Sequence, residues 1–251
     1  MPLRPWCRDP AGCVEHTSGR RQFSVNFCSV RSTSDIACFA DDSLEFMNTN
    51  QTLNQGISHS AVRLCIAADI EHYSRFNNLE AARVQERFTE VLRCARRHAG
   101  LPRYEVDVQH SGDGQFLVLP PGLDESTVIP AFVTGLSTAL RDANANLVTH
   151  LCLRLRVAMH RGLLKPGHNG WVGNSAIAVH RFLDSTSIRT ALAGQPDAGF
   201  GLIVSDTLYQ DVIAHGYPGL MPTLFRRTVV DNRQRGFTEQ AWVYLAGCVT
   251  G

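Results

Sequence analysis

The stretch "VQHSGDGQFLVLP", Val108 to Pro120, decides how the chain is interpreted, because it places an aspartate between two glycines among residues typical of β-strands. Gly112-Asp113-Gly114 suits a hairpin turn, since glycine adopts positive φ freely and aspartate tolerates turns. A turn is by itself a sufficient explanation of the three residues. Asp113 gains a further meaning only together with a second acid elsewhere in the chain.

That second acid is Asp69, which ends "AVRLCIAAD" (61–69), a continuous apolar run expected to form a central strand. A carboxylate at the end of a buried strand needs a partner or a cation, although a local cap is the simpler explanation. If the hairpin around Asp113 pairs beside this strand, the two carboxylates face each other and repel. A divalent cation removes the repulsion, and two such ions can activate an attacking oxygen and stabilise a departing one.

The remaining pattern predicts an α+β fold, in which helices pack on one face of an antiparallel sheet. Apolar residues recur at helical spacing over 77–100 and 124–145, and 150–162 alternates as a half-buried strand. We also expect a glycine-led helix within 170–184, a strand and a capped helix within 201–216, and a closing hairpin over 223–245 with an arginine-rich tip.

Composition places the chain among soluble globular proteins with one main domain. Residues 1–58 show no sustained period and predict a disordered or loosely packed extension, which leaves 59–251 as the folded domain. The 24 basic and 23 acidic residues give a formal charge of +1, so no strong field recruits nucleic acid or an anionic membrane. No window approaches the roughly 20 apolar residues of a membrane span, and the N-terminus lacks a signal-peptide core. We therefore expect a cytoplasmic protein.

Cysteine and histidine spacing does not favour a zinc site. The eight cysteines contain no Cys-x-x-Cys pair and the ten histidines no His-x-x-x-His pair, so buried free thiols are the better interpretation.

Four segments taken together resemble the signature segments of class III nucleotidyl cyclase catalytic domains, in the same order and at similar spacing. They are "DIEHYS" (69–74), "GDG" (112–114), "LRVAMHRG" (155–162) and "GNSAIAVHR" (173–181), and the resemblance extends over about 61–245. It implies a ferredoxin-like core and a reaction in which a ribose 3′-oxygen attacks the α-phosphorus and pyrophosphate leaves. In such a reaction positioning and charge neutralisation do most of the catalysis.

The resemblance also implies roles for individual residues. Two Mg²⁺ or Mn²⁺ ions would be held by Asp69, Asp113 and the carbonyl of Ile70. The substrate triphosphate would lie on the backbone amides from Ile70 to Ser74, a segment that includes His72 and Tyr73.

A homodimer with active sites shared between subunits is a further implication. Arg181 matches the arginine of the family's Asn-x-x-x-Arg element, which reaches in from the partner subunit and stabilises the pentavalent phosphorus. The family asparagine falls on Ile177, which cannot hydrogen-bond to the ribose. Asn174, one helical turn earlier, is the expected substitute.

The base-recognition positions of the family fall on Gln109 and Gly170, which preserve neither the adenine nor the guanine pairing. Gln109 and Tyr73 remain near the expected base position, whereas His110 should point to the opposite face of its strand. A glutamine amide donates and accepts at once, which suits the edge of uracil or cytosine.

Small domains with such altered pockets resemble the pyrimidine cyclases of Pycsar antiphage systems, which make cyclic UMP or cyclic CMP as an alarm signal. Tyr73, where phenylalanine is more usual, fits that subgroup. Two alternatives to a pyrimidine cyclase stay open. The first is an adenylate or guanylate cyclase, and the second is a catalytically silent nucleotide-binding or interaction module. Ile177 favours the silent module, and the retained pair Asp69 and Asp113 argues against it.

Overall fold

The structure is a computed structural model that describes residues 59–232 and 236–247. The predicted extension over 1–58 and the arginines at 233 and 235 of the predicted hairpin tip lie outside the described residues. The strands are β1 (Ala61–Ile70), β2 (Asp107–Ser111), β3 (Gly114–Val118), β4 (Leu155–Gly167), β5 (Gly170–Val172), β6 (Ala198–Ser205), β7 (Arg226–Asn232) and β8 (Phe237–Gly247). The α-helices are α1 (Asn78–His98), α2 (Glu125–Asn144), α3 (Asn174–Leu183), α4 (Thr186–Ala193) and α5 (Asp206–Asp211). Short 3₁₀ helices cover Tyr73–Arg75, Leu101–Arg103, Thr149–Leu151, Ile213–His215 and Pro222–Leu224.

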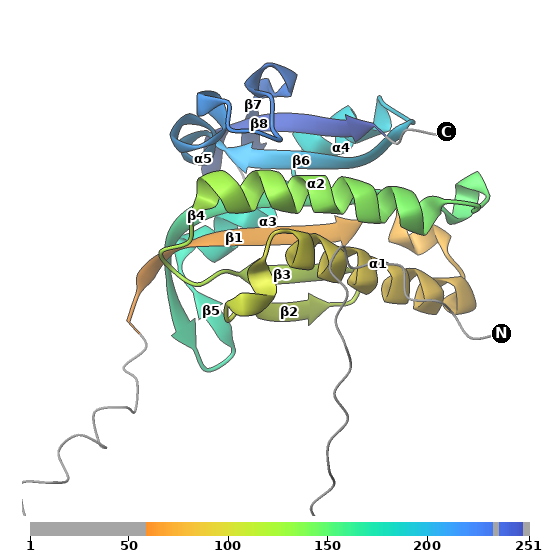
Figure 1. Ribbon diagram of the computed structural model, residues 1–251, viewed down its shortest axis with the longest axis horizontal. Helices are drawn as coiled ribbons and strands as arrows, with labels where there is room; N and C mark the ends of the chain where they lie inside the picture. The colour runs from red at the N-terminus through yellow and green to blue at the C-terminus, as the bar shows by residue number, and fades with distance from the viewer. Residues whose placement is uncertain (1–58, 233–235, 248–251) are drawn as a thin grey trace, which may run out of the picture. The chain divides into compact units, whose positions relative to one another are not determined.

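The strands form one sheet in the order β2-β3-β1-β4-β6-β8-β7, with β5 attached to β4 (Figure 1). The predicted α+β class and its sheet with packed helices are confirmed. Within the described residues β4 and β6 pair in parallel, whereas the other strand pairs are antiparallel. The parallel pair follows from connectivity, because α3 and α4 form a crossover between these two strands.

Helices cover both faces of the sheet, so the expectation of a single covered face is incomplete. Leu64, Ile66 and Ala68 of β1 belong to the core cluster that includes residues of α1 and α2. The alternate residues Cys65 and Ala67 pack with residues of α3 and α4 in a second cluster. The unbroken apolar run of β1 is the sequence signature of a strand buried on both faces.

Local signals fix the ends of the long helices. Asn77 and Glu80 form a reciprocal capping box at the start of α1, and Gly100, at φ 69°, follows its end. Asp124 caps α2 by accepting a hydrogen bond from the backbone N–H of Ser126. These two helices begin where the periodic pattern predicts.

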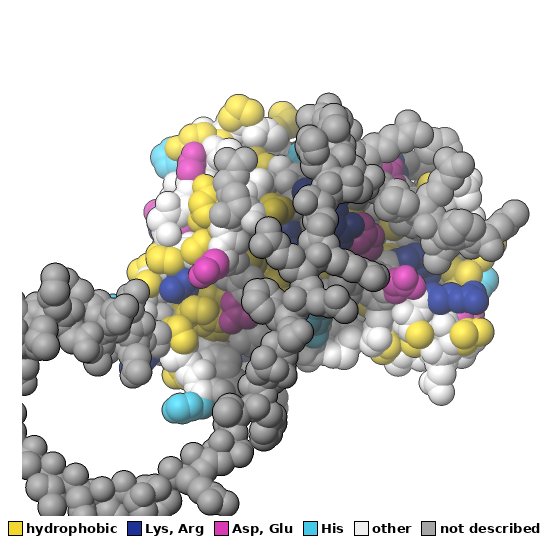
Figure 2. All heavy atoms as spheres, turned by 60° about the horizontal axis from the view of Figure 1, so that its bottom comes forward, with side chains coloured by type: hydrophobic (Ala, Val, Ile, Leu, Met, Phe, Trp, Pro, Cys, Tyr) yellow, Lys and Arg dark blue, Asp and Glu magenta, His cyan; other side chains and the backbone are white. Residues whose placement is uncertain are grey.

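Within the described residues no helix is long and apolar enough to cross a membrane. On the face shown in Figure 2, acidic and basic side chains are interspersed with hydrophobic ones rather than gathered into a field of one sign. This distribution agrees with the balanced formal charge of the chain.

Candidate functional site

Asp69 and Asp113 come together where β1 ends and the β2–β3 hairpin turns. The Cα of Asp69 lies opposite that of Gly114 in the β1–β3 register, and the backbone N–H of Ile70 donates to the carbonyl of Asp113 at 3.1 Å. A Cβ at Gly114 would lie 3.1 Å from the Ala68 carbonyl oxygen, so glycine permits this close approach. Gly112 supplies the positive φ of the turn, at 56°. The glycines therefore serve the hairpin and also bring the two aspartates to the same end of the sheet.

The Asp69 carboxylate is buried and bound by an arginine. Arg156 of β4, the register partner of Asp69, donates to both carboxylate oxygens at 2.8 and 2.5 Å, and the two side chains are 12% and 13% exposed. Burial raises the pKa of Asp69 to about 6, since it outweighs the hydrogen bonds and charge of Arg156, which lower that pKa. The charges of Asp113 and Asp184 raise it further, so three carboxylates share this region.

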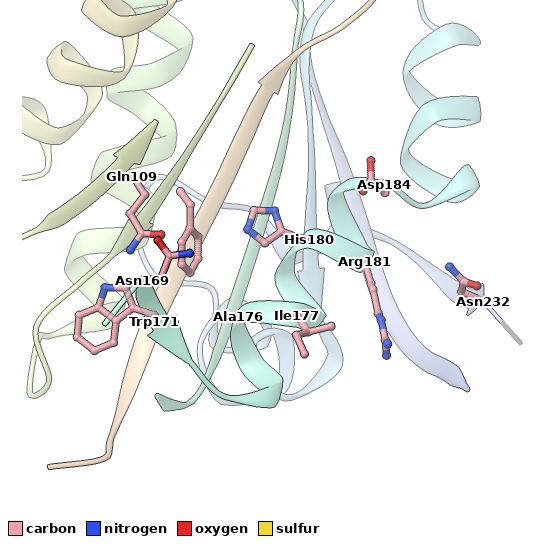
Figure 3. A pocket seen from close by; sticks show the side chains of 10 residues that line it. Gln109, Asn169, Trp171, Ala176, Ile177, His180, Arg181, Asp184 and Asn232 are labelled. Atoms are coloured by element: carbon pink, nitrogen blue, oxygen red, sulfur yellow. The ribbon is translucent and has the colours of Figure 1, made fainter. Parts of the chain in front are cut away.

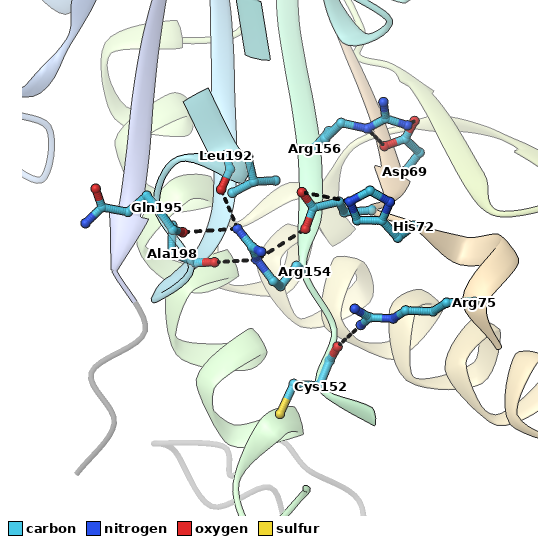
Figure 4. A network of polar contacts seen from close by, with 10 residues as sticks. Asp69, His72, Arg75, Cys152, Arg154, Arg156, Leu192, Gln195 and Ala198 are labelled. Atoms are coloured by element: carbon cyan, nitrogen blue, oxygen red, sulfur yellow. Dashed lines mark hydrogen bonds and ion pairs between the residues drawn. The ribbon is translucent and has the colours of Figure 1, made fainter. Parts of the chain in front are cut away.

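A second ion pair lies beside the first, in the segment after β1 (Figure 4). The buried Glu71 pairs with Arg154 at 3.2 Å, and its backbone N–H donates to the Arg154 carbonyl at 2.8 Å. Arg154 also donates to the carbonyls of Leu192, Gln195 and Ala198, at 2.6 to 3.1 Å. The segment expected to hold phosphates is thus connected to the last turn of α4, the loop that follows it and the first residue of β6.

The rest of that segment is a tight turn. His72 has φ 52° and ψ 40°, a left-handed conformation that is unfavourable for a residue with a Cβ, and its side chain is 70% exposed. Ser74 is exposed, within the 3₁₀ helix Tyr73–Arg75. Gln85 of α1 donates to the Tyr73 hydroxyl at 2.9 Å and to the Gly112 carbonyl at 3.0 Å. This glutamine joins the turn after β1 to the turn that carries Asp113.

A pocket of about 400 Å³ lies on the sheet face covered by α3 (Figure 3). Gln109, Asn169 and Trp171 line one end. Arg181 and Asp184 lie toward the other end, with Asn232 of β7. Ala176, Ile177 and His180 lie between these two ends, and Phe116 also lines the pocket. Gln109 and Arg181, two residues singled out in the sequence, therefore face the same space.

The other predicted residues fall at several distances from this pocket. Ile177, 52% exposed, lines it, whereas Asn174 begins α3 one turn earlier and is not among its lining residues. Tyr73 packs against the core cluster of α1 and α2, so a single chain does not place it beside Gln109. His110 is the register partner of Gln115, whose amide reaches Thr89 of α1, so His110 points away from the pocket as expected.

Arg181 is held against an aromatic ring. Its guanidinium lies 5.0 Å from the ring centroid of Phe237 on β8, a distance typical of a cation–π contact. Partial burial raises the pKa of Glu239, and the charge of Arg181 acts in the opposite direction with a smaller effect. The arginine therefore lies on the pocket side of α3 with its charge only partly balanced.

The groups that could ligate a metal at the end of the sheet near Asp69 are carboxylate and carbonyl oxygens. Among the described residues no group of three or more His, Cys, Asp or Glu side chains could hold a metal ion. A cation here would rest on two carboxylates and backbone oxygens and would complete its shell with water or phosphate, which is the preference of Mg²⁺. Arg156 occupies one direction on each Asp69 oxygen, and a carboxylate has about four acceptor directions in all.

The sequence did not single out Arg154 and Arg156, nor the residues of the turn between β4 and β5. Arg156 stands at an alternating position of β4, but only the strand register shows that it faces Asp69. Asn169 and Trp171 belong to the turn between β4 and β5 and to β5 itself. "GHNG" (167–170) is a recognisable turn signal. Where that turn folds back is a tertiary property.

No protein-family model and no curated protein sequence matches this chain. Among solved structures it is similar to the guanylyl cyclase Cya2, with a TM-score of 0.53 and 16% identity over 76% of this chain and 94% of that one. It is also similar to an adenylate/guanylate cyclase/hydrolase from Silicibacter pomeroyi, with a TM-score of 0.52 and 15% identity over 75% and 98% of the two chains. A bacterial light-regulated adenylyl cyclase gives 0.51 and 12% over 73% and 52%. The chain therefore has the class III nucleotidyl cyclase fold.

Proposed function

We propose that this chain is a nucleotidyl cyclase that converts a pyrimidine nucleoside triphosphate into a 3′,5′-cyclic nucleotide and pyrophosphate. The observation that carries the proposal is the meeting of Asp69 and Asp113 at one end of the sheet, where the fold brings together two acids 44 positions apart in the sequence. Two adjacent carboxylates with one arginine leave excess negative charge. That excess favours a bound cation.

The donor set fits Mg²⁺ or Mn²⁺, and we assign Asp69, Asp113 and the Ile70 carbonyl to hold two ions. When bound, they supply charge neutralisation at the triphosphate and lower the pKa of the 3′-hydroxyl. The backbone from Ile70 to Ser74 is assigned to the phosphates, with Glu71 and Arg154 fixing its position. In the reaction the 3′-oxygen forms a bond to the α-phosphorus, the bond to the β-phosphate oxygen breaks, and the hydroxyl proton passes to solvent.

The remaining roles require a second copy of the chain. Arg181 of the partner subunit is assigned to the charge that develops on the α-phosphoryl oxygens, and Gln109 of the partner to the base. Their position in one pocket supports a common task. Ile177 takes the place of a ribose ligand and offers no hydrogen bond, so we expect slower turnover than a polar residue there would give. Asn174 on the same helix is the assigned substitute.

An adenylate or guanylate cyclase is the second candidate, favoured by the likeness to cyclases whose names give those activities. The uncharged pair Gln109 and Gly170 argues for a pyrimidine instead. We further propose that the product acts as an antiphage alarm signal. A silent module remains the third candidate, and Ile177 is the observation in its favour.

Product analysis separates the candidates. The purified protein is incubated with UTP, CTP, ATP or GTP and Mn²⁺, and products are identified by mass spectrometry, with Asp113→Ala as the control. Cyclic UMP or cyclic CMP supports the proposal, and cyclic AMP or cyclic GMP supports the second candidate. No product from a folded dimer supports the silent module. Mixing Asp113→Ala with Arg181→Ala should restore part of the activity, because one of the two shared sites is then intact.

A further inference from the structure

The end of the pocket beside β2 is built from two carboxamides and an indole. Gln109 comes from β2, Asn169 from the turn between β4 and β5, and Trp171 from β5. Figure 3 shows the Gln109 and Asn169 side chains side by side with Trp171 next to them. Within the part of the chain that the structure describes, neither carboxamide has a hydrogen-bond partner. Two adjacent amides with free donors and acceptors are therefore available to a ligand.

Trp171 is fixed in place from two directions. Its indole N–H donates to the Asp107 carboxylate at 2.6 Å, and the Arg63 guanidinium lies 4.7 Å from the ring centroid. The hydrogen bond holds the edge of the ring and the cation covers one face. Because the ring also lines the pocket, it forms a rigid aromatic wall there. Such a wall suits a flat ring in the ligand.

Gly170 stands at the second base-recognition position expected from the sequence and has no side chain, and the neighbouring Asn169 carries the second amide. A Cβ at Gly170 would lie 2.8 Å from Nε2 and 3.0 Å from Oε1 of Gln109, and the glycine has φ 99°. A side chain at 170 would therefore strain the backbone and would push the Gln109 amide out of its present position. Glycine at 170 leaves that amide in place and supplies no side-chain polar group. Its neighbour Asn169, exposed at the turn, presents one instead.

We propose that Asn169 contacts the base together with Gln109, that Trp171 stacks against the base, and that these three residues select pyrimidines as a class. This inference rests on the proposed cyclase function and assigns the substrate class of that site. Gln109 is matched to N3 and the C4 substituent, which present a donor and an acceptor in one order in uracil and in the reverse order in cytosine. An unconstrained amide satisfies either order by rotating.

The Asn169 amide N–H is matched to the C2 carbonyl, which uracil and cytosine share. Adenine has only a C–H at C2, and guanine has an amino group there. A purine also carries this edge farther from the ribose, so side chains placed for a pyrimidine do not meet it. The site should therefore separate pyrimidines from purines more strongly than it separates UTP from CTP.

Binding is measured by calorimetry on the full chain with Mn²⁺ and the α,β-methylene analogues of UTP, CTP, ATP and GTP. The bridging carbon prevents pyrophosphate release, so binding is observed without turnover. Inorganic tripolyphosphate serves as the probe without a base. We expect the two pyrimidine analogues to bind within about threefold of each other and at least about tenfold more tightly than the purine analogues.

Asn169→Asp replaces the amide donor by an acceptor of the same shape. It should weaken both pyrimidine analogues about tenfold, because a donor to the C2 carbonyl becomes a repelling oxygen, and it should leave tripolyphosphate binding unchanged. Asn146→Asp makes the same change at an exposed site outside the pocket and should alter neither. Equal weakening of tripolyphosphate, or unchanged binding of the pyrimidine analogues by Asn169→Asp, would overturn the role of Asn169.

Tryptophan fluorescence supplies a second readout. The chain has three tryptophans, and stacking predicts that a pyrimidine analogue changes the Trp171 emission while tripolyphosphate does not. Trp171→Phe should abolish that change. An identical response to tripolyphosphate argues against stacking. If the wild-type chain binds none of the four analogues, the proposed function itself fails, whereas binding that is indifferent to Asn169 and Trp171 overturns only this inference.

Discussion

The Arg156 guanidinium holds both oxygens of the Asp69 carboxylate, at 2.8 and 2.5 Å, across the β1–β4 pair. Asp69 is the first of the two aspartates assigned to bind metal, so an internal cation already partly neutralises it. Arg156 and a divalent ion then draw on the same carboxylate. Arg156 should therefore stabilise the protein when no metal is bound, and it should lower the affinity of the site at Asp69 for a divalent ion.

Arg156→Gln tests this competition. In EDTA the variant should lose about 3 to 5 kcal/mol of unfolding free energy, because the buried Asp69 carboxylate loses its partner. Mn²⁺ should then stabilise the variant more than the wild type, since the ion replaces the missing charge. Chemical denaturation with and without Mn²⁺ measures both effects.

Arg93→Gln is the matched control, because Arg93 forms a more exposed pair with Glu90 on α1. It should cost less than about 1 kcal/mol. It should also leave the response to Mn²⁺ unchanged. Equal stabilisation of Arg156→Gln and the wild type by Mn²⁺ would mean that the ion does not bind at Asp69.

The left-handed backbone of His72 provides a test of the segment assigned to the phosphates. His72→Gly should raise the melting temperature slightly, by an amount equivalent to less than about 1 kcal/mol, because relief of strain exceeds the added freedom of the unfolded chain. Nucleotide binding should persist, since the assigned contacts are backbone N–H groups and the His72 side chain is exposed. Thermal melts and calorimetry with the UTP analogue check the two parts.

Asn146 is the control, because among the described residues it is the other non-glycine with positive φ, at 67°. Asparagine tolerates this conformation, so Asn146→Gly should gain less than His72→Gly. A large loss of nucleotide affinity in His72→Gly, with stability preserved, would assign the contact to the imidazole instead of the backbone.

Local pattern predicts that Asp69 ends a strand and that Asp113 lies in a hairpin turn, because an apolar run ends in the first acid and glycines flank the second. Their approach depends on the pairing of β3 with β1, which was a condition of the sequence interpretation. Arg156 required the register, because a shift of one residue would turn its side chain to the other face of β4. The facing ends of β1 and β4, Ile70 and Leu155, are 85 positions apart in the sequence, and no local signal sets that register.

Helix α3 was predicted, whereas helix α4 and the turn between β4 and β5 were harder to predict, for different reasons. Helix α4 has only eight residues and depends on the Ser185 cap and on packing of Ile188 and Leu192, so its periodic signal is weak. Trp171 and Asn169 gain their meaning from a strand of three residues that folds toward β2, where Asp107 and Gln109 meet them. These contacts join segments that no periodic pattern relates.

Gln109→Glu should redirect base preference. A carboxylate only accepts hydrogen bonds, so it repels the C4 carbonyl of uracil and still accepts from the 4-amino group of cytosine. The variant should lose at least about tenfold in kcat/KM for UTP and less for CTP, so that CTP becomes the preferred substrate. Steady-state assays with the four nucleotides check this outcome. Gln109→Met should weaken all four without a new preference, and an unaltered ranking in Gln109→Glu would remove Gln109 from the base site.

His160 gives the chain a defined response to acid. Burial lowers the pKa of His160 to about 4, with the charge of Arg161 acting in the same direction, and its ring packs 5.7 Å from that of Phe182. The folded state therefore resists protonation that the unfolded chain accepts near its ordinary pKa of 6.5. The stability from neutral His160 is present above pH 6.5 and is lost as pH falls toward 4.

Between pH 7 and 4, His160→Gln should therefore lose less unfolding free energy than the wild type, by about 2 to 3 kcal/mol. Asp69 acts in the opposite direction over part of this range, because its raised pKa of about 6 makes the folded state gain a proton first. That contribution is common to both proteins and cancels in the difference.

Denaturant titrations at several pH values measure the difference directly. His215→Gln, at an exposed position, should follow the wild type. Parallel curves for His160→Gln and the wild type would show that His160 is not held neutral by the fold.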